Sequence, residues 1–286
     1  MSAAVRAYFE LTKPGITLFI GITAGAGFIT ALGGWGMPGL LMVTLLATML
    51  MSAGAATLNQ VVEQRWDAMM ARTASRPIPS GLVSERSARV FGWALSGIGL
   101  VLSLALLPWA TALFLVLCHV SYVFAYTPLK RRTPLCTLTG AIPGALPVLA
   151  GWAATGQPID VVAIALTGVL FMWQIPHFLA IGWMARDDYA SAGCPMLGVV
   201  ESTGRASARI SLFYASAMLV CALVVGVMSD AGAVFLATAL ATGGAYVLFA
   251  WRFVQRRDRA PARQLFFSSL LVLPILLGAL MLDLAV

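Results

Sequence analysis

Apolar segments long enough to cross a membrane recur along the whole chain, and they constrain its fold more than any other feature. A helix needs about 20 mostly apolar residues to span the hydrocarbon core of a bilayer. Only 10% of the residues are charged, whereas soluble domains have about 25%. We therefore expect an all-α, polytopic membrane protein in which residues 1–286 form a single transmembrane domain, with nine helices around a central cavity. The nine apolar segments are residues 16–34, 38–58, 88–107, 109–126, 136–155, 161–184, 209–229, 232–251 and 264–283.

The basic residues predict how these segments are oriented. When the N-terminus is placed in the cytoplasm, all 18 lysines and arginines fall on the cytoplasmic side, and the other side carries only Asp160, Asp230 and Asp283. Cytoplasmic loops of membrane proteins carry such an excess of Lys and Arg. We therefore expect a multi-pass protein of the cytoplasmic (inner) membrane with its N-terminus inside. The net charge of +7 is explained by this topology and by contact with anionic lipid, so we expect no nucleic acid partner.

Asn59, Glu63 and Asp67 follow one another at intervals of four residues where the second span reaches the cytoplasm. A helix turns every 3.6 residues, so this spacing places all three side chains on one face. Their oxygen atoms suit Mg²⁺, which proteins usually hold through one or two carboxylates and substrate phosphates. Arg72 and Arg76 follow, and guanidinium groups match phosphate oxygens. The alternative is a solvated loop face in which these acids and arginines only pair with one another.

A second pair of acids, Asp187 and Asp188, lies at the cytoplasmic end of the sixth span. Because the two acidic connections lie on the same side, they can face each other across a cavity. A metal-bound diphosphate would bridge them, since an anion cannot sit between bare carboxylates. Lys130 is a further candidate phosphate contact on this side. We assign its neighbours Arg131 and Arg132 to anchoring at the membrane surface.

The two histidines, His119 and His177, lie inside predicted spans, where an ionisable side chain is costly unless it has a partner. We expect His119 to be structural, with a hydrogen bond to a neighbouring helix. Pro176 precedes His177, and a proline inside a membrane helix predicts a break beside a cavity. His177 is therefore a candidate contact for a flat hydrophobic substrate.

Four motifs resemble those of the protoheme IX farnesyltransferases, also called heme O synthases, within the intramembrane prenyltransferase superfamily. In chain order they are LTKPGIT (11–17), NQVVEQRWDAMMARTASRPIPSG (59–81), YTPLKRRTPLCTLTGAIPGALPVLAGWAA (126–154) and PHFLAIGWMARDDYASAGCPML (176–197). The resemblance covers about residues 8–200. Its specificity comes from the presence of four motifs in the family's order.

The resemblance implies a reaction and a set of residue roles. A farnesyl group passes from farnesyl diphosphate to a vinyl group of protoheme IX (heme B), water is added, and heme O and pyrophosphate leave. Heme O would serve a terminal oxidase directly or pass to a heme A synthase. With heme as the acceptor, we expect His177 to contact its iron or a propionate. The implied catalytic and Mg²⁺-binding residues are Asn59, Glu63, Asp67, Asp187 and Asp188, and the implied diphosphate-binding residues are Arg72, Arg76 and Lys130.

The sequence departs from the superfamily pattern at two points. The first motif usually reads Asn-x-x-x-Asp-x-x-x-Asp, and here the middle acid is Glu63, one methylene longer. The second motif usually has two aspartates four residues apart, whereas Asp187 and Asp188 are adjacent and Ala192 stands four residues after Asp188. The number of metal ions therefore stays open, as does the acid that holds each ion.

Two other functions stay open as well. A quinone- or chlorophyll-type aromatic prenyltransferase would use the same diphosphate site with another acceptor, and only the motifs of the heme branch argue against it. A secondary transporter would also place ionisable residues beside broken helices. Transporters keep such residues near the bilayer midplane, whereas every acid here lies at the end of a span.

Overall fold

The computed structural model describes residues 2–285, and its regular elements in this range are all helices. Met1 and Val286, the two ends of the predicted domain, lie outside the described residues. Nine spans are long and apolar enough to cross a membrane within this range, which confirms the predicted all-α, nine-span architecture. Eight are single helices: α2 (Pro14–Leu32), α3 (Pro38–Asp67), α4 (Glu85–Leu106), α7 (Cys136–Ala154), α8 (Val161–Met184), α11 (Arg205–Met228), α12 (Ala233–Arg256) and α13 (Arg259–Asp283).

The remaining span is composite, and three short helices lie outside the spans. Residues Trp109–Leu129 form the fourth span from α5 (Trp109–Val120), a π-helical turn η1 (Ser121–Tyr126) and α6 (Thr127–Leu129). The short helices are α1 (Ala3–Leu11), α9 (Arg186–Ser191) and α10 (Leu197–Val200).

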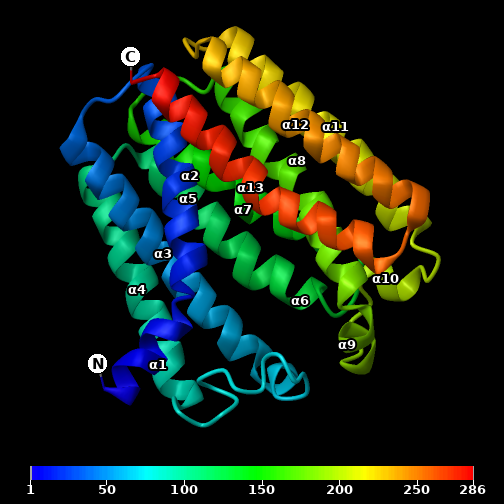
Figure 1. The fold of residues 1–286 in the computed structure, drawn as a ribbon. Coiled ribbons are helices and arrows are strands. Elements are labelled where there is room, and N and C mark those ends of the chain that lie inside the picture. Colours follow the sequence, from blue (N-terminus) through cyan, green and yellow to red (C-terminus); the bar gives the residue numbers. More distant parts are fainter. Residues whose placement is uncertain (1, 286) are drawn as a thin grey trace.

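The spans pack in two groups. The first contains α2, α3, α4, α5 and α7, and the second contains α8, α11, α12 and α13. Contacts of α7 with α8 and of α2 with α13 join the groups. In Figure 1, α4 lies at one edge of the bundle and α11 and α12 lie at the other, with α2 and α13 between them.

Two glycines bring α2 and α7 into direct backbone contact. A Cβ atom on Gly27 would lie 2.2 Å from the carbonyl oxygen of Val148, and one on Gly151 would lie 1.8 Å from that of Ala24. No side chain fits at such distances, and small residues are the usual means by which membrane helices approach closely. This contact fixes α7 against the first span.

Both acidic connections lie at one end of the bundle. Figure 1 shows the N-terminus, the α3–α4 connection and α9 at this end, and the C-terminus at the opposite end. The arrangement agrees with the predicted placement of the acidic segments on one side of the membrane. The identity of that side as cytoplasmic and the central cavity stay predictions.

Two helices differ from their predicted course. The apolar run predicted a second span ending at residue 58, but α3 continues to Asp67, so the polar residues that follow lie on the same helix. The predicted break at Pro176 was wrong, because α8 runs without interruption from Val161 to Met184. Membrane helices tolerate proline where their neighbours pack around it, and α8 packs against α7, α11 and α13.

Candidate active site

One face of α3 turns polar at the end of the second span. Asn59, Glu63 and Asp67 form this polar face, and only 2%, 6% and 1% of their respective surfaces are exposed. Their predicted placement on one helix is confirmed. Ionised carboxylates buried to this degree are costly unless cations and hydrogen bonds compensate them.

Each member of the polar face accepts a hydrogen bond from a cation on another segment. One cation comes from the corner between α1 and α2, one from the α3–α4 connection and one from the residue after α6. Three positive groups thus converge on two carboxylates and an amide. The contacts are Lys13 Nζ to Asn59 Oδ1 at 2.9 Å, Arg76 Nη1 to Asp67 Oδ2 at 2.6 Å and Lys130 Nζ to Glu63 Oε1 at 3.0 Å.

Lys13 is a site residue that the sequence analysis missed. Its φ of 47° is left-handed, a backbone conformation that few residues other than glycine adopt. Gln60 holds the α1–α2 corner on α3 by donating from Nε2 to the carbonyl oxygen of Leu11 at 2.8 Å. Burial lowers the pKa of Lys13 to about 8, and the positive charge of Arg76 adds to this effect. The available signal was the LTKPGIT motif, in which this lysine directly precedes a span.

Lys130 reaches the polar face through the π-helical turn before α6. Thr127 Oγ1 donates to the carbonyl oxygen of Tyr122 at 2.8 Å across this turn and accepts a hydrogen bond from Asn59 Nδ2 at 3.1 Å. Turns of this kind are rare and occur frequently at functional sites. Burial lowers the pKa of Lys130, but Glu63 and other nearby groups raise it by more, so the pKa lies above its usual value. Lys130 is therefore charged at neutral pH.

Arg131 stacks on Trp66 of α3, with its guanidinium carbon 3.4 Å from the centre of the ring. This contact gives Arg131 a partner on α3, whereas Arg132 is exposed. That both residues anchor the chain at the membrane surface stays a prediction. Trp66 lies one turn after Glu63 on α3. The stacked pair therefore holds the segment of Lys130 against the helix that carries its partner.

The structure does not bring the other predicted site residues onto the polar face. Arg72 is exposed, because α3 ends at Asp67 and the following turns carry Arg72 away. Asp187 and Asp188 are exposed on α9, where Asp187 Oδ1 lies 3.8 Å from Arg186 Nε. In the part of the chain that the structure describes, no three His, Cys, Asp or Glu side chains are grouped as metal ligands.

The two acidic segments are nevertheless linked by a buried cluster. Tyr189, which follows Asp188, is 7% exposed and packs in one cluster with Met70 of the α3–α4 connection and Cys136 at the start of α7. Cys136 Sγ also lies 3.7 Å from Met196 Sδ. Both acidic segments thus share packing at one end of α7.

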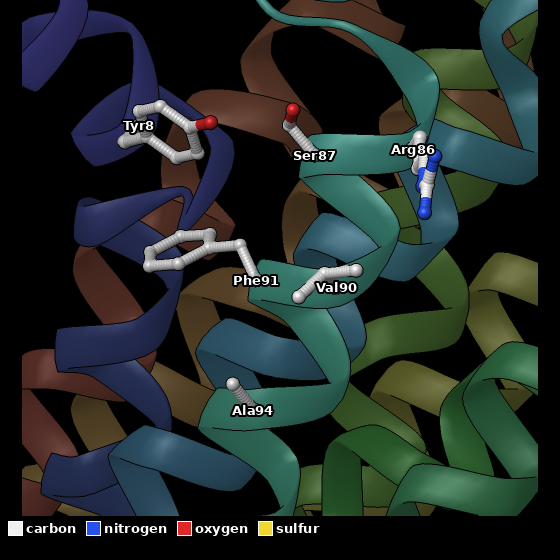
Figure 2. A pocket seen from close by; sticks show the side chains of 6 residues that line it. All are labelled: Tyr8, Arg86, Ser87, Val90, Phe91 and Ala94. Carbon is white, nitrogen blue, oxygen red and sulfur yellow. The ribbon is translucent and has the colours of Figure 1, made fainter.

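Two cavities open at this end of the molecule. The larger, of about 480 Å³, lies between α1 and α4 and contains none of the predicted site residues. Figure 2 shows Tyr8 and Phe91 beside each other in its wall, with ring centres 5.0 Å apart. The smaller, of about 400 Å³, is lined by Lys13 and Arg76 together with Glu10 and Gln60. The smaller cavity therefore gives a ligand access to two of the three cations.

The histidines occupy different environments. His119 is buried on α5, with Nδ1 3.4 Å from the carbonyl oxygen of Met51 on α3, which confirms the predicted contact with a neighbouring helix. His177 is partly exposed on α8, with Nδ1 2.7 Å from Ser269 Oγ of α13. Its ring also stacks on Trp173, with 5.2 Å between the ring centres.

A family model described as the UbiA prenyltransferase family matches residues 19–271, a region that includes the whole polar face. The chain belongs to the UbiA prenyltransferase family. It is a multi-pass membrane enzyme, and the polar face of α3 lies in the part that UbiA proteins share.

Full-length relatives extend the resemblance that the four motifs predicted. A protein named protoheme IX farnesyltransferase from Opitutus terrae is 41% identical over 279 residues, covering 96% of this chain and 94% of that protein. One of the same name from Koribacter versatilis is 37% identical over 304 residues, covering 99% of this chain and 94% of that protein. The predicted family is confirmed.

Two solved structures share the fold. A digeranylgeranylglyceryl phosphate synthase superposes with a TM-score of 0.83 at 14% identity, over 99% of both chains. A UbiA homologue from Archaeoglobus fulgidus, bound to DMAPP and Mg²⁺, superposes with a TM-score of 0.69 at 15% identity, over 96% of this chain and 98% of that one. At these identities the likeness shows the fold alone.

Proposed function

We propose that this UbiA enzyme transfers a farnesyl group from farnesyl diphosphate to a vinyl group of heme B, with addition of water, to give heme O and pyrophosphate. The observation that carries the proposal is the buried polar face, on which Lys13, Arg76 and Lys130 converge. The shared name of the relatives supports farnesyl diphosphate as the donor and heme B as the acceptor.

The polar face fits a hard divalent cation. Asn59, Glu63 and Asp67 offer only oxygen donors, which is the ligand chemistry that Mg²⁺ prefers. The UbiA homologue that holds Mg²⁺ beside a prenyl diphosphate supports this choice. When bound, Mg²⁺ supplies positive charge that stabilises the departing diphosphate.

The three cations of the site hold the diphosphate in this proposal. In the structure, Lys13, Arg76 and Lys130 compensate the polar face. When the diphosphate binds, they exchange these contacts for phosphate oxygens, and the carboxylate oxygens are freed. Negative charge grows on the diphosphate as the allylic C–O bond breaks, and cations already in place stabilise it where it develops. Arg72, on the same connection as Arg76, would add a further phosphate contact.

Asp187 and Asp188 complete the metal–diphosphate site in this proposal. Both are exposed on a helix of six residues, and the single ion pair of Asp187 is long, at 3.8 Å. Tyr189 and Met70 belong to one buried cluster, which links this helix to the α3–α4 connection. A bound diphosphate would therefore have a second set of oxygen donors within the same end of the bundle.

The acceptor reaches the site from the membrane. The farnesyl chain and the porphyrin are both lipid-soluble, and apolar helix walls would keep water from the allylic cation until it is captured. His177, within α8, contacts the heme iron or a propionate. We place the protein in the cytoplasmic membrane with the polar face on the cytoplasmic side, and heme O then passes to a terminal oxidase or a heme A synthase.

The test is an assay of purified protein in detergent with heme B, farnesyl diphosphate and Mg²⁺, followed by mass spectrometry of the heme. We expect a heme heavier by one farnesyl group and one hydroxyl group, because the second proton of the added water is released. This product is expected to form in the presence of Mg²⁺ and not after EDTA is added. Prenylation of an aromatic quinone precursor, with heme B left unchanged, would contradict the assigned acceptor and leave the diphosphate site in place. Inactivity of folded protein on every acceptor would contradict the proposal as a whole.

A further inference from the structure

The imidazole of His177 makes its one side-chain hydrogen bond within the described residues through Nδ1. The partner is Ser269 Oγ of α13, at 2.7 Å. Ser269 is fully buried, so water does not compete for this contact. Which ring nitrogen of His177 carries the proton therefore depends on whether Ser269 Oγ donates or accepts in this hydrogen bond.

The hydroxyl proton of Ser269 already forms a different hydrogen bond. Ser269 Oγ donates to the carbonyl oxygen of Phe266 at 2.5 Å, one turn earlier on the same helix. Two oxygen atoms approach this closely only with a proton between them, and a serine hydroxyl has a single proton to give. Ser269 Oγ must then accept from His177, so the ring proton is on Nδ1. The other ring nitrogen, Nε2, is left with a free lone pair.

Three aromatic side chains surround this imidazole. Its ring centre lies 5.2 Å from that of Trp173, 5.5 Å from that of Phe178 and 5.1 Å from that of Phe266. With the ring proton on Nδ1, Nε2 has no proton to donate to a propionate, whereas Nε2 with a free lone pair is among the commonest metal ligands in proteins. This tautomer thus favours the iron of the heme over its propionates.

The hydrogen bond to His177 is supported by two neighbouring contacts. Trp173 Nε1 donates to the carbonyl oxygen of Ser269 at 2.9 Å, and Tyr246 OH donates to the carbonyl oxygen of Trp173 at 2.9 Å. Helices α8, α12 and α13 are therefore tied together around the histidine. Trp173 also contacts Phe19 of α2, with 6.0 Å between ring centres. The histidine is thus held by three helices beside the first span.

We propose that His177 binds the iron of heme B through Nε2 and that Ser269 is the positioning residue that keeps the proton on Nδ1. This inference rests on the proposed function, because it takes heme B as the acceptor. A hydrogen bond at the far nitrogen of a metal-binding histidine fixes the ring and raises its basicity, and its loss typically costs about 10- to 100-fold in metal affinity.

The test is a titration of ferrous heme B into the full-length protein in detergent, followed by absorption and resonance Raman spectroscopy. The wild type is expected to show an iron–histidine stretching band. His177→Gly is expected to lose the band, and added imidazole is expected to restore it. Ser269→Ala is expected to keep the band at a shifted frequency and to bind heme B roughly 10-fold more weakly.

The chain supplies a matched control for each variant. Ser268 Oγ donates to the carbonyl oxygen of Leu265 at 2.8 Å, the same bond to its own helix that Ser269 makes, but without a histidine partner. Ser268→Ala is therefore expected to leave the band and the affinity unchanged. His119→Ala is expected to do the same, since His119 contacts α3 instead. If His177→Gly does not fold, His177→Gln is compared in its place, with folding checked by size-exclusion chromatography.

An iron–histidine band that persists in the folded His177 variant would overturn the inference. A Ser269→Ala variant with the frequency and affinity of Ser268→Ala would also overturn it. Wild-type protein that makes heme O but shows no iron–histidine band would overturn this inference alone. Wild-type protein that binds no heme B would overturn both this inference and the proposed acceptor.

Discussion

At the scale of single residues, the polar face of α3 is a set of mutual contacts rather than a row of free acids. The spacing of Asn59, Glu63 and Asp67 was predictable because helical periodicity is local. The pairing of Lys13 with Asn59 was not, because it spans 46 residues and depends on how the α1–α2 corner docks on α3. Arg72 was predicted to lie at the site but is exposed, and the sequence gives no sign that α3 ends at Asp67.

Asp67→Ala is expected to lower turnover by about 100-fold or more, because charge on the departing diphosphate loses its stabilisation. Heme B affinity is expected to stay unchanged, since Asp67 lies on α3 and the proposed heme contact lies on α8. A heme titration and a product assay on the same preparation measure the heme B affinity and the turnover. Glu85→Ala is the control, because Glu85 is 44% exposed and pairs with Arg89 on its own helix. Parallel loss of heme binding and turnover would contradict separate donor and acceptor sites.

Trp66→Leu is expected to lower kcat/KM for farnesyl diphosphate by roughly 5-fold, because a partly exposed cation–π contact is worth about 1 kcal/mol. Without the ring, Arg131 no longer holds the segment of Lys130 on α3. Trp66→Phe is expected to retain most of the activity, since Phe also presents an aromatic face. Arg132→Ala serves as the control on the same segment, because Arg132 is exposed. Equal activity of Trp66→Leu and wild type would show that the stacked pair has no part in placing Lys130.

At the scale of elements, the ends and irregular turns of helices matter more to the site than their apolar centres. The extent of the fourth span was predicted closely. Its π-helical turn was not, because such a turn has no periodic signal in the sequence. That turn places Lys130 and Thr127. The start of α11 is a second example. Gly204 offers no side-chain cap there, and Glu201 accepts hydrogen bonds from the backbone N–H groups of Thr203 at 2.9 Å and Ala206 at 3.0 Å.

The start of α11 is expected to fray as the pH falls. The hydrogen bond from the Thr203 side chain, with those from the backbone, lowers the pKa of the Glu201 carboxyl in the folded protein. The cap is therefore complete above the ordinary carboxyl pKa and is lost as the pH falls through the lowered value. Hydrogen exchange at Ala206, corrected for the intrinsic rate, is expected to speed up over this range. In Glu201→Gln the corrected rate is expected not to change with pH, and a wild type that behaves the same way would contradict the assigned cap.

At the scale of the whole molecule, the number of spans was predictable and their arrangement was not. Length and apolarity are local properties of each segment, so nine spans follow from the sequence alone. Which helices touch depends on shape, as in the contact that Gly27 and Gly151 allow between α2 and α7. That residues 1–286 form one domain with its N-terminus in the cytoplasm stays a prediction.

Reporter fusions test this orientation. Because all 18 basic residues fall on one side, alkaline phosphatase fused after the last span, α13, is expected to be active, since the enzyme works outside the cytoplasm. The same reporter fused after Arg257, between α12 and α13, is expected to be inactive. The reverse pattern would contradict the predicted topology.

The exchange of contacts on the polar face is tested most directly by a structure with Mg²⁺ and farnesyl thiodiphosphate, a slowly reacting substrate analogue. We expect Lys130 and Arg76 to leave Glu63 and Asp67, which they contact at 3.0 and 2.6 Å in the present structure, and to bind phosphate oxygens instead. The freed carboxylates would then ligate Mg²⁺. A diphosphate bound elsewhere, with both ion pairs intact, would contradict the account.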